Sequence, residues 1–196
     1  MISQFIKYFS IKCHYQKGIC VYQEQDLCDR IGLIHSGQVD LIHYTINGDE
    51  RVLATLHEFD LFGDFLINSP NPFYPGDLVT KEETVISYLD KEKLNQILSK
   101  DIKFQKFFIS QLSIKALKLN QHNKILMQST LREKILMWLL YERNNQKTNQ
   151  IKIPKKETLA NYFNVARPSL SRELIQMKNA KLIDYDRHYI YLKEVI

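Results

Sequence analysis

ETLANYFNVARPSLSRELIQMKNAKLIDY, residues 157–185, predicts two short helices joined by a tight turn. Leu159, Ala160 and Phe163 are spaced to form one buried face of the first helix. Asn164 tolerates the left-handed backbone that such a turn needs. Pro168 then fits the first turn of a second helix, where no backbone donor is lost. The pattern is typical of a helix-turn-helix.

The residues that follow predict a β-hairpin, so the unit is expected to be a winged helix-turn-helix. Residues 182–185 and 189–192 read as two short strands, and Asp186-Arg187-His188 is expected at the tip between them. The inward face of the second helix is expected to consist of Leu170, Leu174 and Met177.

This winged unit is predicted to bind DNA. Residues 129–196 hold 13 Lys and Arg against 7 Asp and Glu, whereas residues 1–128 hold 14 against 15. The second helix of such a unit enters the major groove, where an arginine fork suits guanine. The side chains expected to contact DNA are Arg167, Ser169, Ser171, Arg172, Gln176, Lys155, Lys156, Arg187 and His188.

Upstream, a short helix over residues 91–99 and a long one over residues 102–128 are predicted. The long stretch contains neither Gly nor Pro, and its apolar positions follow a heptad pattern. This favours a dimer seam, with packing on the chain's own domain as the alternative. Thr130 and Glu133 predict a capping box at the next helix. The seam residues are Ile109, Leu112, Ala116, Leu119, Asn123 and Leu126.

The first ninety residues predict a β-rich unit. Alternating stretches at 18–22, 31–35, 39–44 and 52–56 are separated by turn residues. Asn47-Gly48 predicts a type I′ hairpin. Short strands at this spacing suggest a sandwich, a jelly roll or a β-roll. Residues 144–150 are expected to be a polar linker.

The composition indicates an ordinary folded protein. The chain has 196 residues, of which 44% are hydrophobic and 25% charged. No apolar run could span a membrane, and the first ten residues lack a signal-peptide pattern. Three cysteines suggest a reducing compartment, so a cytoplasmic location is expected.

The whole chain resembles the Crp/Fnr family of bacterial transcription regulators. VARPSLSREL (165–174) is similar to the family's DNA-binding domain, and GICVYQEQD (18–26), IGLIHSGQVDLIHY (31–44) and LFGDFLI (61–67) are similar to its β-roll. The resemblance implies an α+β fold. Its parts would be a double-stranded β-helix or jelly-roll domain of the cyclic-nucleotide-binding kind (1–100), a dimerisation helix (101–128) and a winged helix-turn-helix (129–196). It further implies a homodimer on a near-palindromic promoter site, RNA polymerase as a partner and a small-molecule effector.

The sensor departs from the cyclic-AMP-binding members, which carry Gly-Glu followed by Arg-Ser. Gly63-Asp64 stands in the first place, and residues 73–77 contain no Arg. A buried cyclic phosphate needs a charged partner, so cyclic AMP is not expected and the effector stays unknown. The residues expected to line an effector pocket are Gly63, Asp64, Phe65 and Tyr74.

The cysteines and histidines argue against a metal cofactor. Cys13, Cys20 and Cys28 have no fourth partner for an iron-sulfur cluster, although a thiol switch stays open. The six histidines form no metal-binding spacing, and nothing supports haem.

The recognition helix also has its own pattern. Pro168 stands where the best-known members carry a Glu that accepts from cytosine, so the preferred DNA site should differ from theirs. Two alternatives remain besides this non-enzymatic regulator. They are a cupin-like metal enzyme and a regulatory module that binds a small molecule but no DNA.

Overall fold

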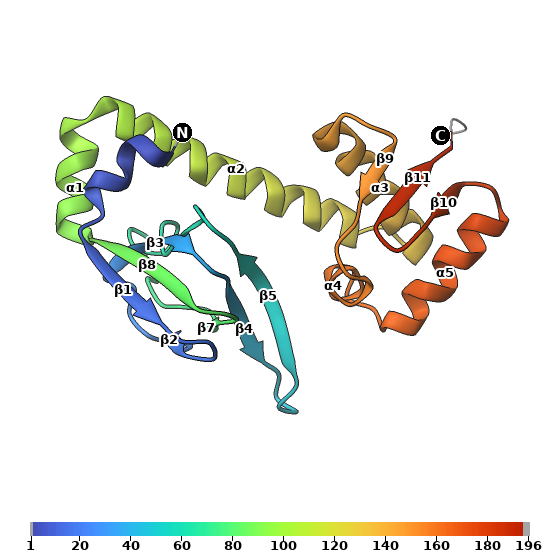
Figure 1. The fold of residues 1–196 in the computed structure, drawn as a ribbon, viewed down its shortest axis with the longest axis horizontal. Helices are drawn as coiled ribbons and strands as arrows, with labels where there is room; N and C mark the ends of the chain where they lie inside the picture. The colour runs from blue at the N-terminus through green and yellow to red at the C-terminus, as the bar shows by residue number, and fades with distance from the viewer. Residues whose placement is uncertain (1, 194–196) are drawn as a thin grey trace. The chain divides into compact units, whose positions relative to one another are not determined.

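The computed structural model describes residues 2–193 and divides into two compact units, Met1–Lys115 and Ala116–Ile196. The boundary falls inside helix α2 (Ile102–Leu126) (Figure 1). Among the described residues, no helix combines the length and the apolar character needed to cross a membrane.

The first unit is a β-roll of two antiparallel four-stranded sheets, ordered β1-β8-β3-β6 and β2-β7-β4-β5. Two helices follow the strands. The elements before α2 are η1 (Ile2–Tyr8), β1 (Ile11–Tyr15), β2 (Cys20–Tyr22), β3 (Arg30–Ser36), β4 (Val39–Tyr44), β5 (Glu50–Leu56), β6 (Leu61–Phe62), β7 (Asp77–Thr80), β8 (Thr84–Asp90) and α1 (Lys91–Lys100).

Strand β3 lies at the centre of the first unit. Ile31, Leu33 and Ile34 are completely buried, so both faces of its sheet are covered, because successive side chains of a strand point to opposite faces. Gly32 permits this packing, since an added Cβ would lie 2.0 Å from the ring of Phe62. The core of the unit therefore depends on β3.

The turn between β4 and β5 differs from the predicted type I′ hairpin. Such a turn needs a positive φ at both central residues. Gly48 has a φ of +83°, whereas Asn47 is not among the residues with positive φ. The strands are instead joined by the five residues 45–49, within which the Gly48 N–H donates to the Thr45 carbonyl at 2.8 Å.

Helix α2 begins with an aromatic face buried in the first unit. Phe104, Phe107 and Phe108 join the same hydrophobic cluster as Leu94 of α1. Asp101 starts the helix, because its carboxylate accepts from the backbone N–H groups of residues 103 and 104. The helix ends at Leu126, two residues before the predicted end.

The second unit is a winged helix-turn-helix, as predicted. Its three-stranded sheet is ordered β10-β11-β9. The capping box of Thr130 and Glu133 is present at the start of α3. The elements are α3 (Leu131–Gln146), β9 (Gln150–Lys152), α4 (Lys156–Tyr162), α5 (Arg167–Asn179), β10 (Ile183–Tyr185) and β11 (Tyr189–Leu192).

The polar linker predicted over residues 144–150 is wrong at both ends. Helix α3 continues to Gln146, and Lys147 ends it in the left-handed conformation with a φ of +53°. Strand β9 begins at Gln150 and pairs with β11. Ile151 and Ile153 are both buried, and their alternation was the sequence signal for this strand.

Candidate nucleic-acid interface

The turn between α4 and α5 has the geometry that the sequence predicted. Asn164 has a φ of +54°, and the N–H of Val165 donates to the carbonyl of Ala160 at 3.0 Å. Pro168 lies in the first turn of α5. Ala166, the N-cap residue, makes no capping hydrogen bond with its side chain. Pro168 has no backbone N–H, and the N–H of Ser169 donates to the Ala166 carbonyl at 2.9 Å, so it is the positive dipole end that favours anions at the start of α5.

Helix α5 is held by one face and presents the other to solvent. Leu170, Leu174 and Met177 have no exposed surface. Arg167, Arg172 and Gln176 are exposed, whereas Ser169 and Ser171 are half-buried. Among the described residues neither arginine has an ion-pair partner, and Arg172 Nε donates only to the Pro168 carbonyl of its own helix at 3.4 Å. Both guanidinium groups are available to a ligand.

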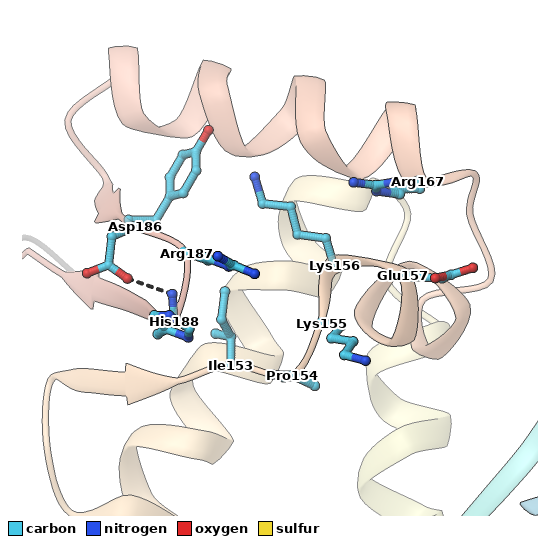
Figure 2. A pocket seen from close by; sticks show the side chains of 10 residues that line it. Ile153, Pro154, Lys155, Lys156, Glu157, Arg167, Asp186, Arg187 and His188 are labelled. Carbon is cyan, nitrogen blue, oxygen red and sulfur yellow. Dashed lines mark hydrogen bonds between the residues drawn. The ribbon is translucent and has the colours of Figure 1, made fainter. Parts of the chain in front are cut away.

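A cavity of about 720 Å³ lies between the start of α4, the start of α5 and the hairpin tip (Figure 2). Five of the nine residues predicted to contact DNA line it, and they come from three separate elements. Its lining consists of Ile153, Pro154, Lys155, Lys156, Glu157, Arg167, Tyr185, Asp186, Arg187 and His188. Five basic side chains against two acidic ones make this hollow a candidate anion site.

Asp186 organises the hairpin tip rather than neutralising its cations. Its Oδ1 accepts from the backbone N–H groups of His188 at 2.7 Å and Tyr189 at 2.8 Å, and its Oδ2 accepts from the Tyr191 hydroxyl at 2.8 Å. These bonds, led by the one from His188, lower the pKa of Asp186. The carboxylate is therefore satisfied inside the hairpin, and Arg187 is left without an ion pair among the described side chains.

Tyr185 is a cavity residue that the sequence interpretation missed. Its ring lies 4.8 Å from Lys156 Nζ and 5.6 Å from Lys178 Nζ. Lys178 in turn pairs with Asp184 at 2.6 Å. An aromatic residue directly before a basic hairpin tip was the available signal. Tyr185 holds the Lys156 ammonium beside the cavity by a cation–π contact.

The residues predicted to line an effector pocket are largely buried. Asp64 accepts from Lys115 Nζ, and Tyr74 stacks on Tyr22 with ring centroids 4.5 Å apart. The Tyr74 hydroxyl has no hydrogen-bond partner among the residues that the structure describes. Gly63 packs against Cys28 and has a φ of +75°. Phe65, by contrast, is half-exposed at 52%.

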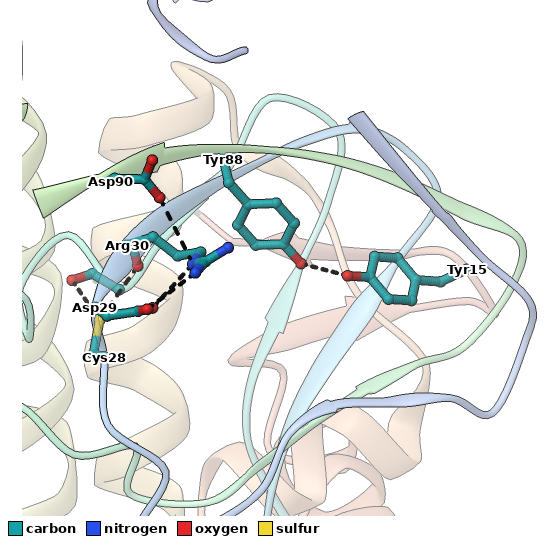
Figure 3. Close-up of polar contacts among 7 residues, drawn as sticks. Tyr15, Cys28, Asp29, Arg30, Tyr88 and Asp90 are labelled. Carbon is teal, nitrogen blue, oxygen red and sulfur yellow. Dashed lines mark hydrogen bonds and ion pairs between the residues drawn. The ribbon is translucent and has the colours of Figure 1, made fainter. Parts of the chain in front are cut away.

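Cys28 of the β-roll lies beside Asp29 and Arg30, with Tyr88 and Tyr15 drawn in the same view (Figure 3). Arg30 pairs with Asp29 through two bonds of 3.0 Å, and the hydroxyls of Tyr15 and Tyr88 are 2.8 Å apart. Burial raises the pKa of the Cys28 thiol, and burial also raises that of Cys20. Neutral thiols are poor nucleophiles and poor metal ligands. Within residues 2–193, no three His, Cys, Asp or Glu side chains are grouped to hold a metal.

Helix α2 places the predicted seam mostly in solvent. Ile109 and Leu119 are 56% and 61% exposed, Ala116 and Asn123 are exposed, and Leu112 and Leu126 are half-buried. The apolar surface is wider than predicted, because other large side chains are exposed along the same helix. These are Ile102, Ile114 and Leu117.

Comparison with known proteins gives a consistent result for both units. The cyclic nucleotide-binding domain family matches residues 12–101, and the Crp-like helix-turn-helix domain family matches residues 133–195. No curated protein matches the sequence.

Solved structures of similar fold extend over nearly the whole chain. The c-di-GMP-responsive global regulator CLP of Xanthomonas campestris has a TM-score of 0.68 and 18% identity, covering 99% of this chain and 98% of its own. A CooA mutant from Carboxydothermus hydrogenoformans has a TM-score of 0.72 and 18% identity, covering 98% and 87%. FixK2 of Bradyrhizobium japonicum has a TM-score of 0.65 and 15% identity, covering 94% and 92%.

These matches confirm the fold class expected from the resemblance, with its N-terminal β-roll, long helix and C-terminal winged unit in that order. The chain belongs to the Crp/Fnr family of transcription regulators, with a cyclic-nucleotide-binding-type domain followed by a Crp-like helix-turn-helix.

Proposed function

We propose that the chain is a homodimeric regulator that binds a near-palindromic promoter site. In this proposal residues 1–100 form the sensor, 101–128 the dimerisation helix and 129–196 the DNA-binding domain. The exposed apolar surface of α2 around Ile109 and Leu119 supports self-association. Two recognition helices would then occupy half-sites roughly 34 Å apart.

One observation carries the DNA-binding proposal. Basic side chains from α4, α5 and the hairpin tip converge on one cavity, and none of them has a carboxylate partner in the described part of the chain. Lys155, Lys156, Arg187 and His188 would contact phosphates and give affinity that falls with salt. The residues proposed to read base edges are Arg167, Ser169, Ser171, Arg172 and Gln176.

The effector is proposed to be a small molecule other than cyclic AMP. Asp64, in the place of the family's Gly-Glu motif, is already paired with Lys115, and residues 73–77 supply no arginine for a cyclic phosphate. CLP is c-di-GMP-responsive, so c-di-GMP and cyclic AMP are both informative probes. The regulator would act in the cytoplasm together with RNA polymerase.

The test is a selection from random-sequence duplexes with the purified full chain, with and without cell extract. Enrichment of a two-fold symmetric sequence supports the proposal. If no sequence is enriched under either condition, the proposal of sequence-specific DNA binding is wrong. The alternative, a regulatory module that binds a small molecule but no DNA, would then be favoured.

A further inference from the structure

We infer that the ion pair between Arg132 and Glu173 is a positioning device for the recognition helix, and that it sets how sharply the protein distinguishes its own site from other DNA. Arg132 Nε lies 2.7 Å from Glu173 Oε1. The inference rests on the proposed function, because it concerns the orientation of base-reading side chains.

The pair is less exposed than its neighbours on the same domain. The Glu173 side chain is 17% exposed and that of Arg132 is 43% exposed. The Lys178–Asp184 pair, also formed by a residue of α5, is 51% and 48% exposed. A carboxylate that is largely removed from water keeps one partner in one geometry, whereas an exposed pair exchanges with solvent and contributes little.

The position of the pair gives it control over α5. Arg132 is the second residue of α3 and lies between Thr130 and Glu133, the two members of the capping box that fixes the start of that helix. Glu173 lies midway along α5, next to Arg172 and before the buried Leu174. Apolar packing holds α5 on the domain but is non-directional. The charge-assisted hydrogen bond is directional and fixes the rotation of α5 about its axis.

The pair also keeps a negative charge away from DNA. Glu173 is adjacent in sequence to Arg172, whose guanidinium has no ion-pair partner among the described residues. A carboxylate released from Arg132 would compete for Arg172 or repel phosphates. Loss of Arg132 is therefore expected to weaken all DNA binding, whereas loss of the Glu173 charge is expected to affect discrimination alone.

The experiment uses the full chain with two fluorescent duplexes, one selected by the wild-type protein and one of scrambled sequence. The measured quantity is the dissociation constant for the scrambled duplex divided by that for the selected duplex, at fixed salt. E173Q should lower this ratio on the order of tenfold by weakening the selected duplex. R132Q should weaken both duplexes, and the double variant should match E173Q. The charge-swapped variant R132E/E173R should recover most of the ratio.

The matched control is D184N, which removes the exposed pair and should leave the ratio within about twofold of wild type. Circular dichroism melting separates positioning from stability. An E173Q protein with a lower melting temperature but an unchanged ratio would overturn the inference and make the pair merely structural. A wild-type protein that selects no duplex would instead remove the proposed function, and the inference with it.

Discussion

Lys115 Nζ in helix α2 lies 2.6 Å and 2.8 Å from the two carboxylate oxygens of Asp64, and it also donates to the Leu61 carbonyl at 2.8 Å. The Asp64 side chain is fully buried, and that of Lys115 is 36% exposed. All three ammonium protons are therefore used to hold α2 on the turn that follows β6. Lys115 lies between Leu112 and Ala116 of the proposed seam. The Lys115–Asp64 ion pair therefore determines which face of α2 is exposed for self-association.

The substitution Lys115→Met should destabilise the first unit, because it leaves Asp64 buried without a counter-ion. Removal of one partner from a buried pair costs ~3–5 kcal/mol, and the partial exposure of Lys115 lowers the expected cost to about 2–3 kcal/mol. Urea unfolding measures this change. The double variant D64N/K115M should be closer to wild type than K115M. The exposed Lys118 provides the control K118M, and equal losses for K115M and K118M would contradict the expectation.

Two arginines of the proposed interface should behave differently on DNA. Arg172→Ala should cost about 1–3 kcal/mol at one base pair and relax the preference there, because this exposed α5 side chain is proposed to read a base edge. Arg187→Ala should weaken all duplexes alike and lower the salt slope by about one, because the hairpin tip is proposed to contact phosphate. Binding to single-base variants of the selected duplex over a range of salt separates the two. A uniform loss for R172A would make Arg172 a phosphate contact.

Ile109→Asp should convert the dimer into a monomer. Ile109 is 56% exposed in the single chain, and a charge there would be buried without a partner in a helix pair. Sedimentation at micromolar concentration measures the mass. K118D is the control, since this exposed residue lies on the same helix outside the seam. If I109D stays a dimer, the self-association surface lies elsewhere. If the wild-type protein is a monomer, there is no such surface.

The hairpin tip should lose stability in acid. The pKa of Asp186 is below its usual value of 3.8 because backbone N–H groups and Tyr191 donate to the carboxylate. A lowered pKa contributes stability that is fully present above the unfolded pKa and is lost as the pH falls through the folded one. The gap in unfolding free energy between wild type and D186N should therefore be widest near neutrality and shrink below about pH 4. The exposed Glu157 gives the control E157Q, whose gap should stay small throughout.

Local chemistry made most of the winged unit readable in advance. Asn164, Pro168 and the Thr130–Glu133 capping box act within a few residues of themselves, and each adopts its predicted conformation. Strand β9 was missed because Ile151 and Ile153 give only one step of alternation, and its partner β11 lies almost forty residues away. The turn at Asn47 was misassigned because its dipeptide fits more than one loop geometry.

The sequence by itself determined the order of the parts, the helix-turn-helix, the basic character of the last third and the family resemblance, since these follow from local spacing and composition. Only the tertiary structure decided which charged side chains form ion pairs and which stay unpaired. Asp64 pairs with Lys115 from 51 residues away and Glu173 pairs with Arg132 from 41 residues away, while Arg167 and Arg187 have no carboxylate partner within residues 2–193. The physical reason is that an ion pair depends on distance and burial in space, and neither is encoded by separation along the chain.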